Sequence, residues 1–162
     1  MLRILKLSGL AFIAAVVGLS MPAAQAGERP GKPLQPVQVN TKWKQECAAC
    51  HIAFAPGLLP AESWRKLMDG LGKHFGSDAS LSTEDNKEIT DFLVKNASNR
   101  WTTKTAPLRI SEATWFKREH GSRNVAPAAW ESPLVKSSSN CQACHRQAEQ
   151  GDFNERNVKI PK

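Results

Sequence analysis

The sequence lacks several features that would place it in common classes of protein. Beyond residues 1–26 it has no further long apolar run, so we expect no membrane-spanning helix of about 20 residues in that part. It has few alternating apolar and polar segments and no turn dipeptide between two such segments, which argues against a β-sheet. Its lysines and arginines do not cluster with aromatic residues, so nucleic-acid binding is not predicted.

Histidine, cysteine and methionine are scarce, and this scarcity limits the possible metal ligands. The chain has 4 histidines and 4 cysteines, and of its 3 methionines only Met68 lies outside residues 1–26. Any metal chemistry must therefore use very few side chains.

Residues 1–26 have the composition of a secretory signal peptide. Arg3 and Lys6 give a basic start, residues 7–19 form a short apolar run, and Ala24-Gln25-Ala26 resembles a cleavage site. We expect removal after Ala26, which leaves 162 − 26 = 136 residues of a soluble, periplasmic protein. The net charge then changes from 22 − 15 = +7 to 20 − 15 = +5, a mild excess typical of a solvated surface.

Local patterns predict a mainly α-helical chain with long irregular loops. Residues 27–40 are rich in proline and glycine and should form an extended arm or flexible lead-in. A helix is expected from residue 41 into the first cysteine motif. Residues 96–107 and 121–139 should be irregular connectors, and a short helix should carry the second motif.

Three further helices are predicted from caps and periodicity. One should begin at Pro60 and run to a stop at Gly76. Ser82 and Asp85 resemble a capping box that opens the next helix, and Ser111 is a candidate cap for a helix ending near Gly121. Apolar residues and one histidine share a face of the first of these helices: Trp64, Leu67, Met68, Leu71, His74 and Phe75.

The pattern C-x-x-C-H occurs twice, and no other internal repeat is present. A boundary near residue 103 would give two parts, residues 41–103 and 104–162, with one motif each. The motif is typical of covalent c-type haem attachment, in which two thiols bond the macrocycle and the following histidine binds iron. The residues predicted to hold two haem c groups in this way are Cys47, Cys50, His51, Cys141, Cys144 and His145.

Two other uses of the cysteines compete with haem attachment. Disulfides are common in exported proteins, but they do not explain a histidine after each cysteine pair. A four-thiolate zinc site normally has its two pairs about 15–20 residues apart, and the gap from Cys50 to Cys141 is far longer. Haem attachment is therefore the preferred interpretation.

The remaining histidines, His74 and His120, match the remaining axial positions of two irons. His74 lies on the apolar helix face, and His120 lies about 40° from Phe116 on its predicted helix, so both can face inward. The alternatives are a hydrogen-bonded core histidine, a surface histidine, or Met68 as a distal ligand. Spacing favours the pairs His51/His74 and His145/His120 but is also compatible with a swapped pairing.

Iron bound by two imidazoles has no open position, so we predict a carrier of single electrons rather than an enzyme. Histidine in place of methionine predicts low reduction potentials, below that of the standard hydrogen electrode. Two other functions remain open: a dihaem peroxidase or gas-binding protein with one open haem, and an electron-transfer subunit of a periplasmic reductase. The tryptophans are expected to wall the haems: Trp43, Trp64, Trp101, Trp115 and Trp130.

Four stretches give the chain a resemblance to the small dihaem cytochrome c family called DHC. They are CAACHIAFAPGLLPAESW, GLGKHFGSDASL, RISEATWFKREH and SNCQACHRQAEQGDF. The resemblance implies a mostly helical, two-part cytochrome c-like fold with two bis-histidine haems and a role in periplasmic electron transfer. It also implies an acceptor, the oxygen-binding monohaem cytochrome SHP, and a membrane cytochrome b as a plausible donor.

Overall fold

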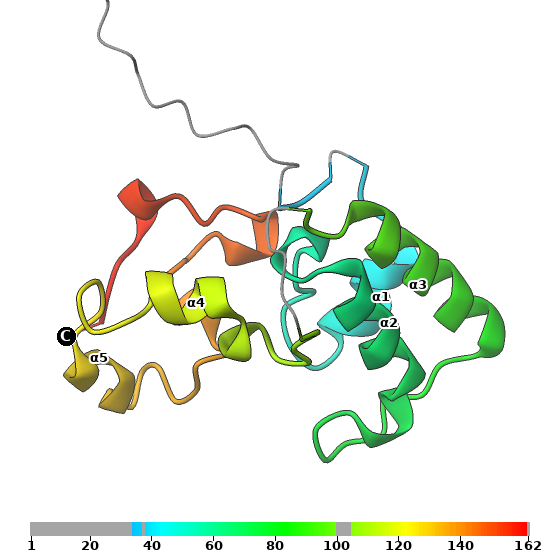
Figure 1. The fold of residues 1–162 in the computed structure, drawn as a ribbon, viewed down its shortest axis with the longest axis horizontal. Helices are drawn as coiled ribbons and strands as arrows, with labels where there is room; N and C mark the ends of the chain where they lie inside the picture. Colours follow the sequence, from blue (N-terminus) through cyan, green and yellow to red (C-terminus); the bar gives the residue numbers. More distant parts are fainter. Residues whose placement is uncertain (1–33, 37, 100–104, 162) are drawn as a thin grey trace, which may run out of the picture.

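The computed structural model describes residues 34–36, 38–99 and 105–161, and these residues are mainly helical. Within these ranges there is no β-strand; only an isolated bridge joins His74 and Ser77. Figure 1 shows α1, α2 and α3 at one end of the molecule, and α4, α5 and the C-terminal turns at the other. We call these the first and second parts. The boundary predicted near residue 103 lies outside the described residues, as do the proposed signal peptide and Trp101.

The first helix carries the beginning of the first cysteine motif. Helix α1 spans Thr41–Ala48, and the side-chain oxygen of Asn40 caps it by accepting a 2.7 Å hydrogen bond from the Trp43 amide. Cys47 therefore lies on the last turn of the helix, and Cys50 follows in the turn beyond it. The predicted helix into the motif is confirmed.

The second helix is shorter than the periodicity predicts. Helix α2 spans Ala61–Asp69 and ends at Gly70, after which a single 3₁₀ turn, η2 (Leu71–Lys73), leads to His74. Gly70 and Gly72 are poor helix formers, and the positive φ values of Phe75 (51°) and Gly76 (102°) reverse the chain. The predicted continuous helix over 60–75 was wrong, and Phe75 is 46% exposed instead of facing the core.

Helix α3 confirms the predicted start at Ser82. It spans Thr83–Asn96, and the Ser82 hydroxyl accepts a 3.0 Å hydrogen bond from the Asp85 amide. Its buried face carries Ile89 and Leu93, which pack against α2. The Trp64 indole donates a 2.7 Å hydrogen bond to the Pro56 carbonyl in η1 (Pro56–Leu58), so this buried N–H is satisfied.

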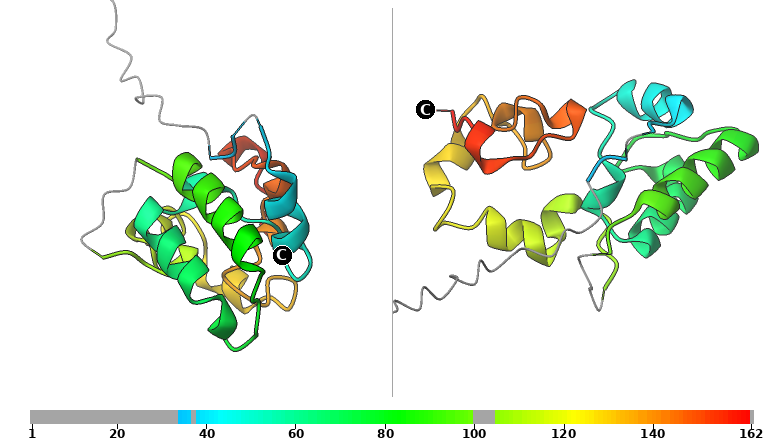
Figure 2. Two further views of the ribbon diagram at one scale, coloured as in Figure 1. Left: turned by 90° about the vertical axis from the view of Figure 1, so that its right-hand side faces the viewer. Right: turned by 90° about the horizontal axis from the view of Figure 1, so that it is seen from above.

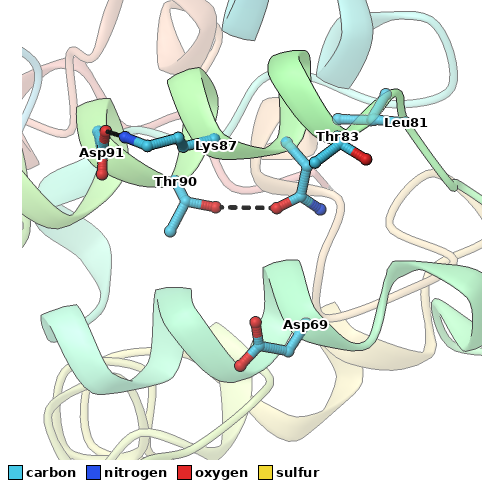
Figure 3. A pocket seen from close by; sticks show the side chains of 7 residues that line it. Asp69, Leu81, Thr83, Lys87, Thr90 and Asp91 are labelled. Carbon is cyan, nitrogen blue, oxygen red and sulfur yellow. Dashed lines mark hydrogen bonds and ion pairs between the residues drawn. The ribbon is translucent and has the colours of Figure 1, made fainter.

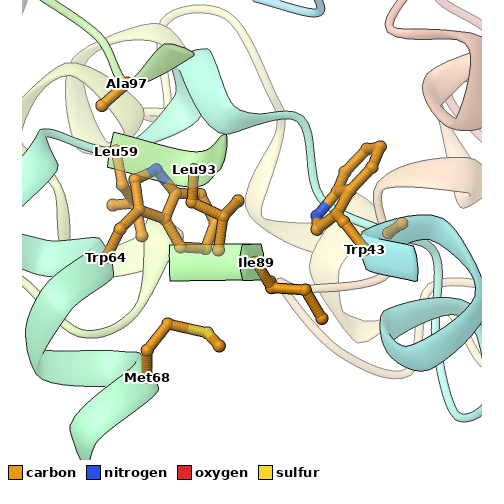
Figure 4. Packing of buried hydrophobic residues seen from close by; sticks show 8 residues of the cluster. Trp43, Leu59, Trp64, Met68, Ile89, Leu93 and Ala97 are labelled. Carbon is orange, nitrogen blue, oxygen red and sulfur yellow. The ribbon is translucent and has the colours of Figure 1, made fainter. Parts of the chain in front are cut away.

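Buried apolar side chains from all three helices form the core of the first part. Figure 4 shows this cluster, in which Met68 lies below the ring of Trp64. Cys47 and Phe54 pack against it from the first motif, and Ile110 packs against it from the second part. The cluster consists of Trp43, Ala53, Leu59, Trp64, Met68, Ile89, Leu93 and Ala97.

The second part is built from short helices and single turns. After η3 (Ile110–Glu112), helix α4 spans Thr114–Glu119 with extended Ala113 before it. Ser111 is therefore not the cap of this helix, because the chain first closes a turn in which the Ala113 amide donates to the Ile110 carbonyl.

A further short helix and three turns complete this part. Helix α5 (Pro127–Glu131) lies in the stretch predicted to be irregular. Proline presets the dihedral of a first helical residue, and the two alanines that follow favour a helix, so that prediction was wrong there. The second motif begins on η4 (Cys141–Ala143), followed by η5 (Ala148–Gln150) and η6 (Glu155–Asn157).

The two parts meet along η1, α1 and α4. Figure 2 shows α4 beside the η1 segment and the C-terminal turns beside α1. The Trp115 indole donates a 3.2 Å hydrogen bond to the Leu58 carbonyl, and Lys44 pairs with Glu149 at 3.8 Å. Of the helices that the structure describes, none is sufficiently long and apolar to cross a bilayer.

The Ile89→Ala variant is expected to lower the free energy of unfolding by about 2–5 kcal/mol, because Ile89 is fully buried in the core. Guanidinium denaturation followed by circular dichroism measures this value. The matched variant Lys87→Ala breaks only an exposed i,i+4 ion pair on the same helix and should cost no more than about 0.5 kcal/mol. Equal effects of the two variants would contradict the placement of this core.

Candidate haem sites

His51 of the first motif lies close to His74, which follows the η2 turn. The rings of His51 and His74 have centroids 6.2 Å apart and planes inclined by 29°. His51 follows α1, and His74 ends the η2 turn, so the early end of α2 at Gly70 helps to set this approach. Phe54 lies 4.8 Å from His51 and Phe75 lies 4.9 Å from His74, between ring centroids.

The second motif has a corresponding pair. The rings of His120 and His145 have centroids 6.0 Å apart and planes inclined by 62°. His120 follows the last residue of α4, and Phe116, one turn earlier, stacks on its ring at 4.0 Å with an angle of 9°. Trp130 of α5 lies 6.1 Å from His120, and Phe153 lies 5.3 Å from His145.

These separations match one metal ion between each pair of rings. Two metal–imidazole bonds of about 2.0–2.1 Å, with roughly 1 Å more from each nitrogen to its ring centre, place the centroids roughly 6 Å apart. The structure thus brings together His51 with His74 and His145 with His120, which is the simpler of the two pairings predicted by spacing. It does not bring Met68 to either pair, since Met68 is buried among core side chains.

Backbone carbonyls orient two of the four rings. Nδ1 of His51 lies 2.7 Å from the Ile52 carbonyl oxygen, and Nδ1 of His120 lies 3.1 Å from that of Phe116. A carbonyl can only accept, so Nδ1 carries the proton in each hydrogen bond and Nε2 is left with a free lone pair. An imidazole held in this tautomer presents Nε2 to a metal ion.

Burial favours the neutral, metal-binding form of three histidines. It is the main reason that the pKa values of His74, His120 and His145 lie below their ordinary value. Repulsion from His51 and Arg109 lowers the pKa of His74 further, and His120 adds repulsion at His145. At His120 the Phe116 carbonyl and Glu119 act in the opposite direction but do not outweigh burial. Neutral imidazole is the form that binds metal.

Three of the four motif cysteines are partly buried, and Cys50 is exposed. Burial, followed by the charge of Glu46, raises the pKa of Cys47 to about 11. Burial likewise raises the pKa of Cys141 to about 11 and moves that of Cys144 upward. Within the second motif the His145 amide donates to the Cys141 carbonyl at 2.8 Å, and the Lys159 amide of the tail donates to the Cys144 carbonyl at 2.9 Å.

The structure shows neither a disulfide nor a metal-binding cluster of three or more side chains among the described residues. All four cysteines are free. Among the described residues no group of three or more histidines, cysteines and carboxylates could hold a metal ion. Each histidine pair instead supplies two donors, which is the number that an iron already bound by a macrocycle requires.

Two surface hollows differ in their relation to the histidines. One of about 340 Å³ lies beside His120 and is lined by aromatic and polar side chains: Ser111, Phe116, Lys117, His120, Trp130 and Ser138. The other, of about 530 Å³, lies between α2 and α3 and contains no residue of either motif. Figure 3 shows Asp69 across this second hollow from the hydrogen-bonded and ion-paired residues of α3.

Comparison with known proteins assigns the chain to a family. Residues 43–153 match the family model described as dihaem cytochrome c, DHC, and this match includes both motifs and all four histidines. The chain is a member of the dihaem cytochrome c family. No curated protein sequence matches it.

Solved structures similar to this cytochrome have the same description. A diheme cytochrome c from Rhodobacter sphaeroides is 42% identical, with a TM-score of 0.65 over 71% of this chain and 97% of that one. DHC purified from the same organism is 45% identical, with a TM-score of 0.64 over 73% and 100%. A diheme cytochrome type c from Shewanella baltica OS155 is 36% identical, with a TM-score of 0.66 over 75% and 93%.

Membership of this family confirms three predictions from the sequence. The chain has a small, mainly α cytochrome fold, it binds two haem c groups covalently, and it is an electron-transfer cytochrome. Sequence reasoning did not identify Arg109 as a neighbour of the first site. Its guanidinium carbon lies 3.9 Å from the centre of the Phe75 ring, and no local pattern links residues so far apart in the chain.

The double variant Cys47→Ala/Cys50→Ala is expected to carry one haem instead of two, because both thioether-forming sulfurs of one motif are removed. Intact-mass measurement of the purified protein counts the haems. The control Ala48→Ser/Ala49→Ser changes the same segment but keeps both sulfurs and should retain two haems. Two haems on the cysteine variant would show that attachment does not use this motif.

Proposed function

We propose that this cytochrome is a periplasmic carrier that passes single electrons through two low-potential bis-histidine haems to a partner protein. The observation that carries the proposal is the arrangement of the only 4 histidines of the chain in two facing pairs. Each pair has the separation that one iron between two imidazoles requires.

In this proposal each motif holds one haem through its two cysteines and its own histidine. Cys47, Cys50 and His51 serve the first haem, and Cys141, Cys144 and His145 serve the second. His74 and His120 supply the opposite axial ligands. The backbone contacts of His51 and His120 support this assignment, since they leave Nε2 of each ring available.

The haem irons would supply a one-electron couple. The residues that bind them determine whether a substrate or gas can also bind the iron. Two protein imidazoles at each iron leave no position for a substrate or gas, so electron transfer is favoured over peroxidase-like chemistry. Histidine ligation also omits methionine, the ligand that raises the potential of ordinary cytochromes c, which supports low potentials. Five aromatic rings lie beside the imidazoles: Phe54, Phe75, Phe116, Trp130 and Phe153.

Carbon monoxide tests whether either iron is open. The reduced wild-type protein should show an unchanged Soret band after carbon monoxide is added, because both axial positions are occupied. His74→Ala and His120→Ala should each bind one carbon monoxide per chain, which absorbance titration measures. The matched variant Met68→Leu removes the alternative distal ligand and should behave as wild type.

Two results would contradict this ligation. Rapid binding of carbon monoxide to wild-type protein at one haem per chain would favour a gas-binding or enzymatic role. A histidine variant that remains closed to carbon monoxide would show that the replaced histidine is not an axial ligand.

The compartment and the partners are part of the same proposal. The basic start, short apolar run and small-residue site of residues 1–26 support export to the periplasm. Likeness to the DHC family supports an SHP-type oxygen-binding monohaem cytochrome as acceptor and a membrane cytochrome b as donor. In this proposal surface lysines and arginines steer an acidic partner, although the propionates of two haems cancel most of the net charge of 20 − 15 = +5.

Stopped-flow mixing tests the proposed acceptor. Protein from the periplasmic fraction, with its N-terminus expected at Gly27, is reduced and mixed with an oxidised SHP-type cytochrome. Oxidation should be fast, saturate with acceptor concentration and slow at high salt, because a Debye length of about 10 Å at 0.1 M ionic strength screens surface charges. A neutral small-molecule oxidant is the control, since its rate should not depend on salt. Failure to reduce the SHP-type protein would exclude it as the acceptor.

A further inference from the structure

Part of the N-terminal arm lies where the two parts meet, although the sequence predicted only an extended or flexible lead-in. The described residues 34–36 run past η1 of the first part and the turn after η5 of the second. In Figure 1 this blue segment lies at the upper edge of the molecule, about midway between the ends formed by the two parts.

The contact with the first part is made at Gly57. The Gly57 amide donates a 2.8 Å hydrogen bond to the Leu34 carbonyl. A Cβ atom at position 57 would lie 2.6 Å from the Leu34 Cα and 2.8 Å from the Leu34 oxygen. These neighbours are backbone atoms, so any side chain at position 57 would displace the arm.

The contact with the second part is made at another glycine. A Cβ atom at Gly151 would lie 2.6 Å from the Gln35 Cβ, and Gly151 has a φ of 78°, which L side chains rarely adopt. The Gln35 Oε1 atom is buried without a hydrogen-bond partner among the described residues. A buried, unpaired amide oxygen is unfavourable, so close packing around the arm must hold Gln35 there.

The direct contacts between the parts lie beside these two glycines. Leu58, which accepts the hydrogen bond from Trp115, follows Gly57 in the chain. Glu149, which pairs with Lys44, precedes Gly151 by two residues. The Lys44–Glu149 pair is exposed and contributes at most about 1 kcal/mol. Consecutive arm residues therefore contact both parts next to the direct contacts between them.

We propose that Leu34 and Gln35 form a strap that fixes the two haem-bearing parts relative to each other. The strap positions the haems and does not bind them, and the inference rests on the proposed function. Electron transfer between two haems falls steeply with their separation. A fixed junction therefore keeps the internal transfer rate uniform across all molecules.

The test uses full-length holoprotein and two kinds of variant. Gly57→Ala displaces the strap from the first part. Leu34→Gly/Gln35→Gly keeps the backbone contact with Gly57 but removes the Gln35 side chain that packs on Gly151 of the second part. Gln35→Met is the matched control, because it keeps the length of the side chain and replaces the amide group, including the unpaired oxygen, by a thioether. Pulsed electron paramagnetic resonance measures the distribution of iron–iron distances, and flash photoreduction measures the rate of electron transfer between the haems.

Both strap variants should broaden the distance distribution and change the internal rate several-fold, with the potential and axial spectrum of each haem unchanged. Gln35→Met should match wild type. The Leu34→Gly/Gln35→Gly variant does not alter a packed position of either part, so it remains informative if Gly57→Ala fails to fold. A wild-type distribution of iron–iron distances in that variant would show that Leu34 and Gln35 do not fix the two parts relative to each other. Failure of the proposed ligation would appear separately, as carbon monoxide binding by the wild-type protein.

Discussion

The proposed ligation depends on one constraint: two imidazole rings must face each other about 6 Å apart, with room for one iron between them. The two histidines of each pair come from separate elements. In the first pair, His51 follows α1 and His74 ends the η2 turn. In the second pair, His145 follows the η4 turn and His120 follows α4. Several irregular features of the fold allow the paired imidazole rings to come this close. Helix α2 stops at Gly70, Phe75 takes a positive φ, and α4 is only 6 residues long.

The sequence predicts those elements whose ends are set by local chemistry. Ser82 caps α3 because its hydroxyl accepts from an amide three residues later, and the mainly helical character follows from the lack of alternating segments. The errors occur where local signals compete. The apolar periodicity of residues 64–75 suggests one helix, but Gly70 and Gly72 end it early. Helix α5 begins at Pro127, which is compatible with either a loop or a first helical turn.

The site is more predictable than the fold because its chemistry is concentrated in few residues. Two C-x-x-C-H motifs indicate the cofactor, and two remaining histidines suggest the other axial ligands, a role that stays a prediction. Contacts between distant residues are not visible in any local pattern. Three contacts join residues that are separated by many positions, and only the folded chain brings them together. They are Arg109 with Phe75, Trp115 with Leu58, and Leu34 with Gly57.

Low-temperature electron paramagnetic resonance of the oxidised wild-type protein tests the central claim most directly, because it reports the axial ligation of each ferric iron. If the 4 histidines saturate both irons, the spectrum will contain two low-spin ferric signals that together account for two haems per chain. The two ring arrangements, inclined by 29° and 62°, should make these signals distinct. A high-spin ferric signal equivalent to one haem per chain would show an open iron and contradict the account.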